Sequence, residues 1–202
     1  MQLQDILDYC REHNIPTISE SAWEQLEATI KKHKPYKILE IGTGSGYSAA
    51  KILNTIKSYA DLKDISFTTV DIDPERFEIA LDNLKALGLY QHTELILEDA
   101  AALLGLYVLQ NRLFDFIFLD GAKAQYINYL PNILKILDKG GILFCDNLSF
   151  HGLAKSGKDT YRKMRTIAVN LQKFEKALKK CSQLKCEILQ AGNDHIAICQ
   201  KI

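Results

Sequence analysis

The sequence predicts an open α/β domain with a mainly parallel sheet of seven strands. Five short apolar segments alternate along the chain with segments of helical periodicity, as in successive strand–helix–strand units. Two further strand-like segments follow, joined by Gly192-Asn193-Asp194, a sequence typical of a hairpin turn. We therefore expect helices on both faces of a parallel sheet that ends in an antiparallel C-terminal hairpin.

The composition fits a single domain, residues 1–202, with residues 1–34 forming a helical segment that packs on the rest. The 25 basic and 25 acidic residues balance, so the net charge indicates neither a nucleic-acid coat nor a binder of acidic partners. The N-terminal stretch is charged throughout and lacks the apolar core of a signal peptide. No apolar run approaches the length of a membrane span, and we expect a cytoplasmic protein with no membrane partner.

Cysteine usage also favours a reducing compartment. The five cysteines, at positions 10, 145, 181, 186 and 199, include no C-x-x-C pair and are odd in number. This pattern is typical of reduced thiols rather than of a disulfide framework or a zinc site.

Two amphipathic helices are expected before the first strand. Residues 2–13 place their apolar side chains on one face, and Pro16 ends this helix. Ser19 or Ser21 can cap the next helix, residues 22–33, which has an apolar face of its own.

The stretch KILEIGTGSGYSAA organises the rest of the chain. Residues 38–41 read as a buried parallel strand, Gly42, Gly44 and Gly46 alternate through a tight turn, and a helix follows to about residue 59. A strand that enters a glycine turn and then a helix N-terminus lets the backbone approach a nucleotide-like ligand closely.

The remaining elements continue the alternation. A β-branched segment ends at Asp71 and Asp73, Pro74 begins a helix, and Gly88 follows its last turn. Lys139-Gly140-Gly141 is expected to form a turn before the fifth strand. The expected strands after the first are 65–72, 93–97, 114–119, 142–145, 185–190 and 195–200, and the expected helices are 75–87, 100–109, 126–137 and 159–180.

Polar residues follow most of the predicted parallel strands. Beyond the glycine turn these are Asp71, Asp99, Asp120 and the pair Asp146-Asn147. The carboxyl ends of parallel strands meet at one edge of a sheet, where ligands bind in folds of this class. Solubility alone does not explain such a series, and we expect these residues to converge on a ligand.

The first two strand ends suggest a nucleoside site. The glycine turn serves several classes of nucleotide binder and also tight turns without a ligand. Asp71 can accept both ribose hydroxyls, or it can cap the following helix, although Asp73 serves that cap equally well. The turn lacks the glycine spacing of NAD sites, and Glu40 occupies a buried strand position. A buried carboxylate needs donors, which a cationic or amine-bearing ligand would supply.

Asp120, Asp146 and Asn147 form the second group. Two carboxylates and an amide oxygen suit Mg²⁺, Mn²⁺ or Ca²⁺ and suit zinc poorly, although D-G and D-N are also common turn dipeptides. Lys123 lies three residues after Asp120 and is a candidate general base, because nearby positive charge disfavours its ammonium form. The alternative for Lys123 is an ordinary solvated lysine at a helix start.

Together these motifs carry a family resemblance. LEIGTGSGYSA, VDIDPERFEIA, D-G-A-K after FDFIFL, and GGILFCDN make the chain similar, from about Ile15 onward, to class I S-adenosylmethionine (SAM)-dependent O-methyltransferases of the metal-dependent, catechol O-methyltransferase-like family. The resemblance implies a Rossmann-like SAM-methyltransferase fold, with SAM and Mg²⁺ as cofactors. It also implies a catalytic pair, Lys123 as the base and Asp120, and a metal site at Asp120, Asp146 and Asn147. The implied cofactor residues are Glu40, Gly42, Gly44, Gly46 and Ser48 around the methionine part, Asp71 at the ribose, Asp99 and Ala100 at the adenine, and Asp120.

Among such enzymes the chain most resembles bacterial tRNA 5-hydroxyuridine methyltransferases, which implies tRNA as partner. The resemblance rests on DGAKAQY (120–126), DNLSFHGL (146–153) and the basic helix that follows. Residues 155–180 hold nine basic and two acidic residues, so seven excess positive charges gather there while the whole chain stays neutral. That segment fits phosphate contacts, or is simply a solvated amphipathic helix. Candidates for stacking on a base are Tyr126, Phe150 and Tyr161.

Two other functions stay open. A small catechol or phenolic acceptor fits the same chemistry, although a late acidic residue that contacts the acceptor in catechol enzymes has no clear counterpart, Asp194 being nearest. A non-catalytic nucleotide-binding module would also explain the glycine turn. The resemblance further allows a homodimer.

Overall fold

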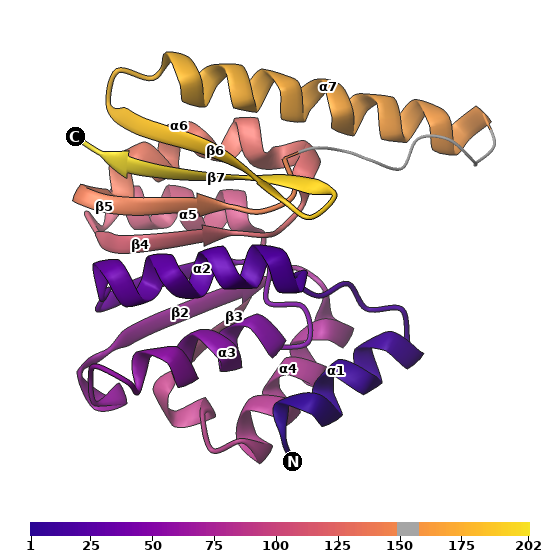
Figure 1. Cartoon of the computed structure of the whole chain (residues 1–202), viewed down its shortest axis with the longest axis vertical. Coiled ribbons are helices and arrows are strands. Elements are labelled where there is room, and N and C mark those ends of the chain that lie inside the picture. Colours follow the sequence, from indigo (N-terminus) through magenta and orange to yellow (C-terminus); the bar gives the residue numbers. More distant parts are fainter. Residues whose placement is uncertain (149–157) are drawn as a thin grey trace.

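A seven-stranded mixed sheet forms the centre of the molecule. The structure, a computed structural model, describes residues 1–148 and 158–202, with the side chains of 158–163 left out. The strand order is β3-β2-β1-β4-β5-β7-β6; β7 pairs antiparallel with both β5 and β6, and the other pairs are parallel. Figure 1 shows the yellow β6–β7 hairpin beside β5. The strands are β1 (Lys37–Ile41), β2 (Ser66–Asp71), β3 (Glu94–Leu97), β4 (Phe114–Leu119), β5 (Leu137–Cys145), β6 (Leu184–Ala191) and β7 (Asp194–Lys201).

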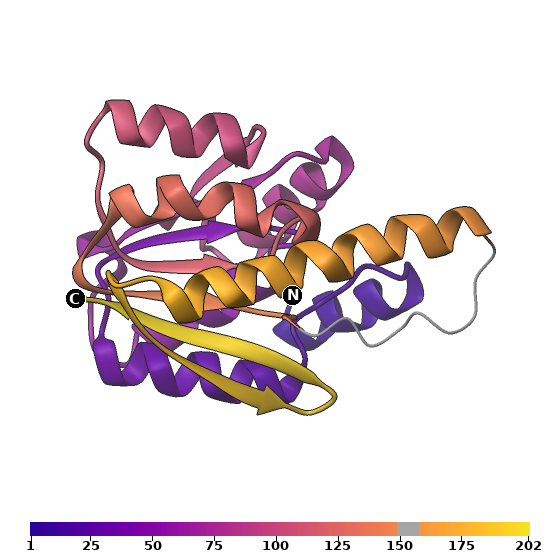
Figure 2. The same cartoon turned by 90° about the horizontal axis from the view of Figure 1, so that it is seen from above.

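Helices cover both faces of the sheet (Figures 1 and 2). One face packs against α1 to α4, and the opposite face packs against α5 to α7. The long α7 crosses its face and reaches beyond the sheet in Figure 2. The helices are α1 (Leu3–Glu12), α2 (Glu20–His33), α3 (Tyr47–Ile56), α4 (Pro74–Ala86), α5 (Ala100–Leu109), α6 (Tyr126–Ile136) and α7 (Lys158–Lys180).

Alternation along the strands divides the core into two layers. In β1, Ile38 packs toward α1–α3 whereas Leu39 and Ile41 pack toward α5–α7. On β2, Phe67 faces the first layer and Val70 the second. Polar residues share this alternation, so Glu40 lies on the same side of β1 as Ile38.

The strand order reverses between β1 and β4, and this switch point fixes the position of the site. In open α/β sheets ligands bind at such a point, outside the carboxyl ends of the strands. Asp120 N donates to Ile41 O at 2.9 Å, and Asp146 N donates to Leu119 O at 3.0 Å. These bonds extend the backbone pairing of β1, β4 and β5 by one residue beyond β4 and β5. The residues that follow the three strands are therefore held close together.

The predicted fold is confirmed, with local differences. Lys139–Gly141 is not a turn before β5; it lies within β5, where the register to β4 shifts between Phe114 and Phe116. Asp194 begins β7, opposite Ala191, and leaves Gly192-Asn193 as the turn. Of the caps considered, Ser19 accepts from Ala22 N and caps α2.

The expectation of reduced cysteines is wrong for one pair. Cys186 and Cys199 face each other across β6 and β7 and form a disulfide. The disulfide cannot be predicted from the spacing of two cysteines thirteen positions apart, because it depends on the register of the hairpin. Cys10, Cys145 and Cys181 are free thiols.

Among the described helices, none combines the length and the apolar character that crossing a bilayer requires.

Candidate active site

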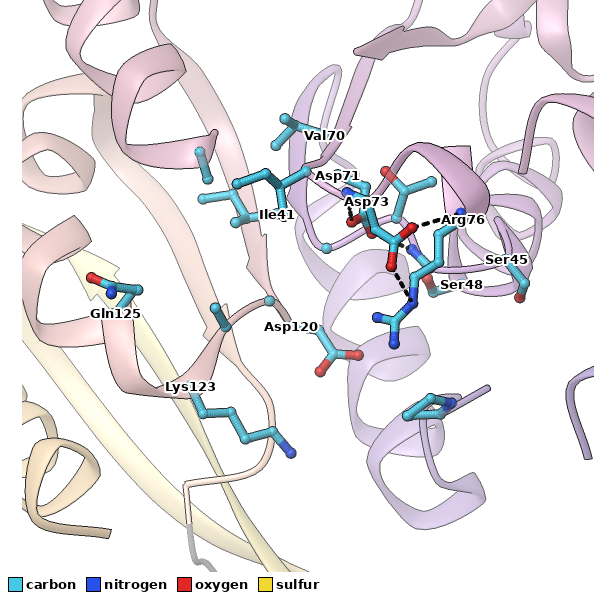
Figure 3. A pocket seen from close by; sticks show the side chains of 18 of the residues that line it. Ile41, Ser45, Ser48, Val70, Asp71, Asp73, Arg76, Asp120, Lys123 and Gln125 are labelled. Atoms are coloured by element: carbon cyan, nitrogen blue, oxygen red, sulfur yellow. Dashed lines mark hydrogen bonds and ion pairs between the residues drawn. The ribbon is translucent and has the colours of Figure 1, made fainter. Parts of the chain in front are cut away.

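A cavity of about 630 Å³ opens at the carboxyl ends of β1, β2, β3 and β4 (Figure 3). This size is typical of a small-molecule or cofactor site. Its wall combines the glycine turn, the ends of four strands and the loop before α2. The lining residues are Pro16, Thr17, Ile18, Ile41, Gly42, Thr43, Gly44, Ser45, Tyr47, Ser48, Val70, Asp71, Ile72, Asp73, Arg76, Glu98, Asp99, Ala100, Ala101, Asp120, Gly121, Ala122, Lys123, Gln125, Tyr129 and Asn147.

The glycine turn supplies one wall, and its first glycine is required by packing. Gly42 has a φ of +103°, and an added Cβ would collide with the backbone of Asp120 and Gly121. Gly44 also lines the cavity, with open space around it. Gly46 is not part of the lining; it is the N-cap of α3 and packs against Ala80.

The N-terminus of α3 is open to an anion. Gly46 is its N-cap and provides no side-chain hydrogen bond. The first N–H groups of a helix lack partners within the helix, and together with the helix dipole they favour a negative group. Tyr47 and Ser48, in this first turn, line the cavity.

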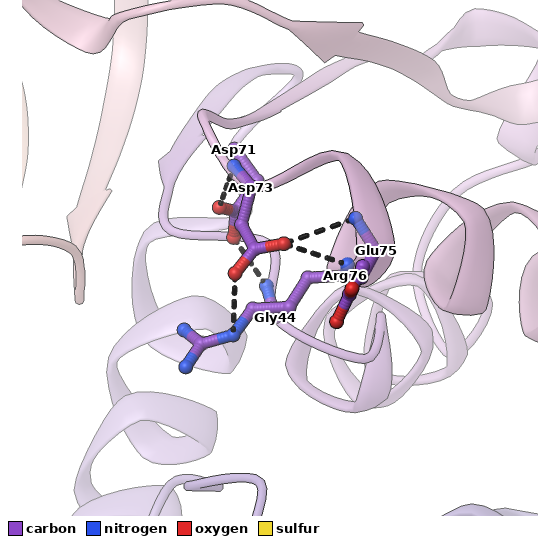
Figure 4. A network of polar contacts seen from close by, with 5 residues as sticks. All are labelled: Gly44, Asp71, Asp73, Glu75 and Arg76. Carbon is purple, nitrogen blue, oxygen red and sulfur yellow. Dashed lines mark hydrogen bonds and ion pairs between the residues drawn. The ribbon is translucent and has the colours of Figure 1, made fainter.

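Asp71 lies at the end of β2 and lines the cavity, and Figure 4 shows it beside Gly44 and Asp73. Its two carboxylate oxygens accept hydrogen bonds from Gly44 N at 2.8 Å and from Asp73 N at 3.0 Å. Each carboxylate oxygen can accept a further bond, so capacity for a ligand hydroxyl remains. Asp73, as expected, caps α4 by accepting from the N–H groups of Glu75 and Arg76.

Glu40 is fully buried and lies behind the cavity wall. Its carboxylate accepts from the Ser48 hydroxyl and from the Thr69 hydroxyl, both at 2.6 Å. A cationic or amine-bearing ligand was expected to supply donors to this carboxylate; in the structure α3 and β2 supply one donor each. Burial raises the pKa of Glu40 to about 7, against the two hydroxyl bonds that lower it, with Asp71 adding a smaller rise.

The end of β3 forms the third part of the wall. Asp99 caps α5 through Ala101 N at 2.6 Å and lines the cavity together with Ala100. Tyr129, from α6, closes this side with its ring almost fully buried. Burial raises the pKa of its hydroxyl, with a further contribution from Asp99.

Asp120, Lys123 and Asn147 lie together at the ends of β4 and β5. Lys123 Nζ donates to Asn147 Oδ1 at 2.6 Å. Burial and the neighbouring Asp146 carboxylate raise the pKa of Asp120 well above its usual range, whereas Lys123 lowers it. Burial likewise raises the pKa of Asp146 to about 6, against the hydrogen bond from Asn147 N and the charge of Lys123.

This group fits a divalent cation. Within the described ranges, no three His, Cys, Asp or Glu side chains come together as a metal cluster, and here the third oxygen belongs to an amide. Asp146 Oδ1 accepts from Asn147 N at 2.8 Å, but Asp146 Oδ2 is buried and has no hydrogen-bond partner among the described residues. A buried carboxylate oxygen without a partner is costly, and a cation removes that cost.

Asp194 reaches the same corner of the site from β7. Its carboxylate accepts from Asn147 Nδ2 at 3.3 Å and from His195 N at 2.7 Å. Asp194, the nearest candidate in sequence for a late acidic residue, therefore contacts the amide of Asn147.

One of the three stacking candidates is excluded by burial. Tyr126 is fully buried, with its ring edge against Phe174 at 5.4 Å between centroids. Its hydroxyl lies 3.2 Å from Leu119 O and 3.4 Å from Asp146 O and shares its one proton between them, so it supports the two strand ends instead. Phe150 and the side chain of Tyr161 lie outside the described residues.

Several lining residues were not found from sequence. The Pro16–Ile18 loop lines the cavity from the N-terminal segment, and Figure 3 shows the Arg76 guanidinium directed between Asp73 and Asp120. Arg76 also pairs with Asp73, Nε to Oδ2 at 3.6 Å. Only the fold signals these positions, because an arginine in the first turn of a helix normally reads as solvated.

The sequence matches known proteins over nearly its full length. A family model described as O-methyltransferase matches residues 6–202. A caffeoyl-CoA O-methyltransferase of Stellaria longipes is 30% identical over 187 residues, covering 90% of this chain and 74% of the relative. A flavonoid 3',5'-methyltransferase of Vitis vinifera is 27% identical over 199 residues, covering 87% and 84%.

Solved structures share the fold. An O-methyltransferase from Bacillus cereus in complex with SAH has a TM-score of 0.79 at 20% identity, covering 99% of this chain and 90% of that one. TomG from Streptomyces achromogenes, an O-methyltransferase in complex with SAM, has a TM-score of 0.81 at 20% identity, covering 98% and 88%.

Proposed function

Because the chain belongs to the O-methyltransferase family, we propose that it transfers a methyl group from SAM to an acceptor oxygen in this cavity, with help from a divalent cation. The observation that carries the proposal is the juxtaposition of two parts. A nucleoside-sized wall at the ends of β1, β2 and β3 faces Asp120 and Asn147, which follow β4 and β5, across one cavity.

The wall fits the parts of SAM. Asp71 has free acceptor capacity for ribose hydroxyls, and Asp99, Ala100 and Tyr129 surround the position expected for the adenine. The uncapped start of α3 suits the carboxylate of the methionine part. Structures of similar fold have been solved with SAH and with SAM.

The metal role rests on Asp120, Asp146 and Asn147. A divalent ion held there would lower the pKa of an acceptor hydroxyl and fix its orientation. Lys123 lies within reach of the same corner and would receive the acceptor proton. With the acceptor oxyanion held in line with the methyl group, proximity and orientation of the two reactants would supply much of the rate acceleration.

We infer that the acceptor is a 5-hydroxyuridine of tRNA, which is methylated to 5-methoxyuridine. Its O5 and O4 are adjacent oxygens, as a metal-bound acceptor requires. The support comes from α7: Asn170 Nδ2 donates to Ala124 O at 2.9 Å, which holds this helix beside the Lys123 turn. Along the described part of α7, Arg165, Lys173 and Lys176 are exposed and available for phosphates.

A small phenolic acceptor is the second candidate, and the relatives favour it. The names of the similar plant proteins are those of caffeoyl-CoA and flavonoid O-methyltransferases. Asp194 beside Asn147 gives this site an acidic group of the kind that catechol enzymes use, which the sequence alone did not assign.

An acceptor panel tests these alternatives. Purified protein is incubated with labelled SAM, Mg²⁺, and either undermethylated bulk tRNA or a set of catechols and phenolic esters. Label in tRNA but not in phenols is the expected result. Label in phenols alone contradicts the tRNA acceptor, and cofactor binding without transfer to any acceptor indicates a non-catalytic nucleotide-binding module.

A further inference from the structure

A chain of hydroxyl groups runs from the cavity wall to the buried Glu40. Thr69 lies on β2 directly opposite Glu40 in the strand register and is fully buried. Its Oγ1 is 2.6 Å from Glu40 Oε2 on one side and 2.6 Å from Thr43 Oγ1 on the other. Thr43 lines the cavity, whereas Thr69 does not.

The proton positions in this chain follow from counting donors. A hydroxyl has one proton and can accept two bonds. With Glu40 ionised, the form that a cationic ligand favours, Thr69 uses its proton on Glu40, and the bond between the threonines is then donated by Thr43. Ser48 uses its proton on the other Glu40 oxygen. Thr43 and Ser48 therefore have no proton left for a ligand.

Both residues line the cavity, and with their protons used inside the network their hydroxyls can act toward a ligand only as acceptors. An ammonium group has three donors and no acceptor, and it is the complement of such a wall. The methionine part of SAM carries an ammonium, whereas its carboxylate finds donors at the start of α3.

We propose that Thr69 is a positioning residue that, together with Glu40, fixes Thr43 and Ser48 as acceptors and so makes the cavity selective for a cofactor bearing an ammonium group. The inference rests on the proposed function, and it assigns a role to a residue that touches no ligand. Thr69 acts through the orientation of Thr43, and without its hydroxyl Thr43 is free to rotate its proton into the cavity.

The test compares two ligands that differ in the amino-acid part. S-Adenosylhomocysteine carries the ammonium and carboxylate, whereas 5'-methylthioadenosine carries only the nucleoside and the thioether. With Thr69→Val, affinity for S-adenosylhomocysteine should fall about tenfold, the loss of roughly one buried hydrogen bond. Affinity for 5'-methylthioadenosine should stay within about twofold of wild type, and Thr69→Ser should restore both.

The neighbouring threonine provides a matched control. Thr68 is equally buried on β2, and its hydroxyl donates to the Glu94 carboxylate at 2.7 Å, but its side chain lies on the other side of the strand. Thr68→Val should leave the ratio of the two affinities unchanged. If Thr69→Val does not fold, Thr43→Val tests the outer end of the chain without uncovering Glu40, with the same selective loss expected.

The outcomes separate the inference from the proposed function. A wild-type protein that binds no S-adenosylhomocysteine overturns both. A wild type that binds it, with Thr69→Val or Thr43→Val weakening both ligands equally or neither, overturns the inference alone. A loss restricted to S-adenosylhomocysteine supports it.

Discussion

The most unusual single residue is Glu40, a carboxylate inside a strand whose neighbours are apolar. It is fully buried, yet both of its oxygens have hydroxyl donors, from Ser48 and Thr69. Two neutral donors do not offset the loss of hydration, so burial raises its pKa to about 7. A cationic ligand nearby would favour the ionised form.

This raised pKa predicts a pH-dependent stability. As pH rises from about 4.3 to about 7, an unfolded chain loses the Glu40 proton while the folded chain retains it, so folding stability falls. The ligand-free wild type should lose roughly 2–3 kcal/mol more between pH 5 and pH 8 than Glu40→Gln does. Urea unfolding at both pH values measures the difference.

Two other carboxylates near Glu40 enter this comparison. Asp71 on β2 adds to the rise in the pKa of Glu40, and Asp120, directly after β4, has its own pKa raised in part by Glu40. Both carboxylates remain in Glu40→Gln, so their contributions to the pH dependence of stability largely cancel when the variant is compared with wild type. Equal losses of stability in wild type and variant would contradict the assignment to Glu40.

Residue identity alone predicted some of these roles and missed others. The strand-end carboxylates stood out in sequence because several predicted parallel strands in succession are each followed by one. Thr69 did not, since a threonine within a β-branched strand reads as a strand former. Tyr126 was misread because α6 packs it against Phe174, which the sequence does not reveal.

At the level of elements, the turn after β1 depends on the close approach of β4. Gly42 has a φ of +103°, and a side chain there would meet the backbone of Asp120. Gly44 also has a positive φ, +56°, but open space around it. A side chain at Gly42 would therefore meet both a steric clash and an unfavourable backbone conformation, whereas one at Gly44 would meet only the unfavourable conformation.

Substitution of each glycine by alanine tests this distinction. Gly42→Ala should lower the free energy of unfolding by about 3 kcal/mol or more, because the turn must move away from β4. Gly44→Ala should cost only about 1 kcal/mol, the ordinary penalty for a left-handed conformation. Chemical denaturation measures both, and similar losses in the two variants would contradict the packing argument.

Helix α7 is the element on which the proposal of a tRNA acceptor depends. Neutralising Arg165 and Lys173 should raise the acceptor KM and reduce the salt dependence of log KM by about 0.7–0.9 per lost phosphate contact. Neutralising Lys31 and Lys32, which are exposed on α2, removes the same charge from the opposite face of the sheet. An unchanged salt slope in the α7 variant, or an equal change in the α2 variant, would exclude α7 from acceptor binding.

The types and order of the elements were predictable because the spacing of apolar residues in the helices differs clearly from that in the strands. The Lys139–Gly141 segment was not, since its glycines read as a turn whereas the pairing with β4 keeps it in β5 as an irregularity. The Cys186–Cys199 disulfide likewise depends on the register of β6 and β7. Both are set by contacts between strands, which no single segment encodes.

At the scale of the whole molecule, the sheet order explains why distant segments form one site. The reversal between β1 and β4 places the glycine turn beside Asp120, and β5 adds Asp146 and Asn147. The convergence of strand ends was predictable from topology alone. The contributions of the Pro16–Ile18 loop and of Arg76 were not, because they depend on how α1, α2 and α4 pack.

The central claim is that the cavity joins a cofactor wall to a metal-assisted acceptor corner. Asp146 tests this junction, since its Oδ2 lacks a partner among the described residues and lies outside the cofactor wall. The direct measurement is the rate of methyl transfer from labelled SAM by Asp146→Ala, alongside its affinity for S-adenosylhomocysteine. We predict that transfer falls on the order of a hundredfold or more while the affinity is largely kept. Transfer at the wild-type rate, or wild-type transfer that persists in a chelator, would contradict the account.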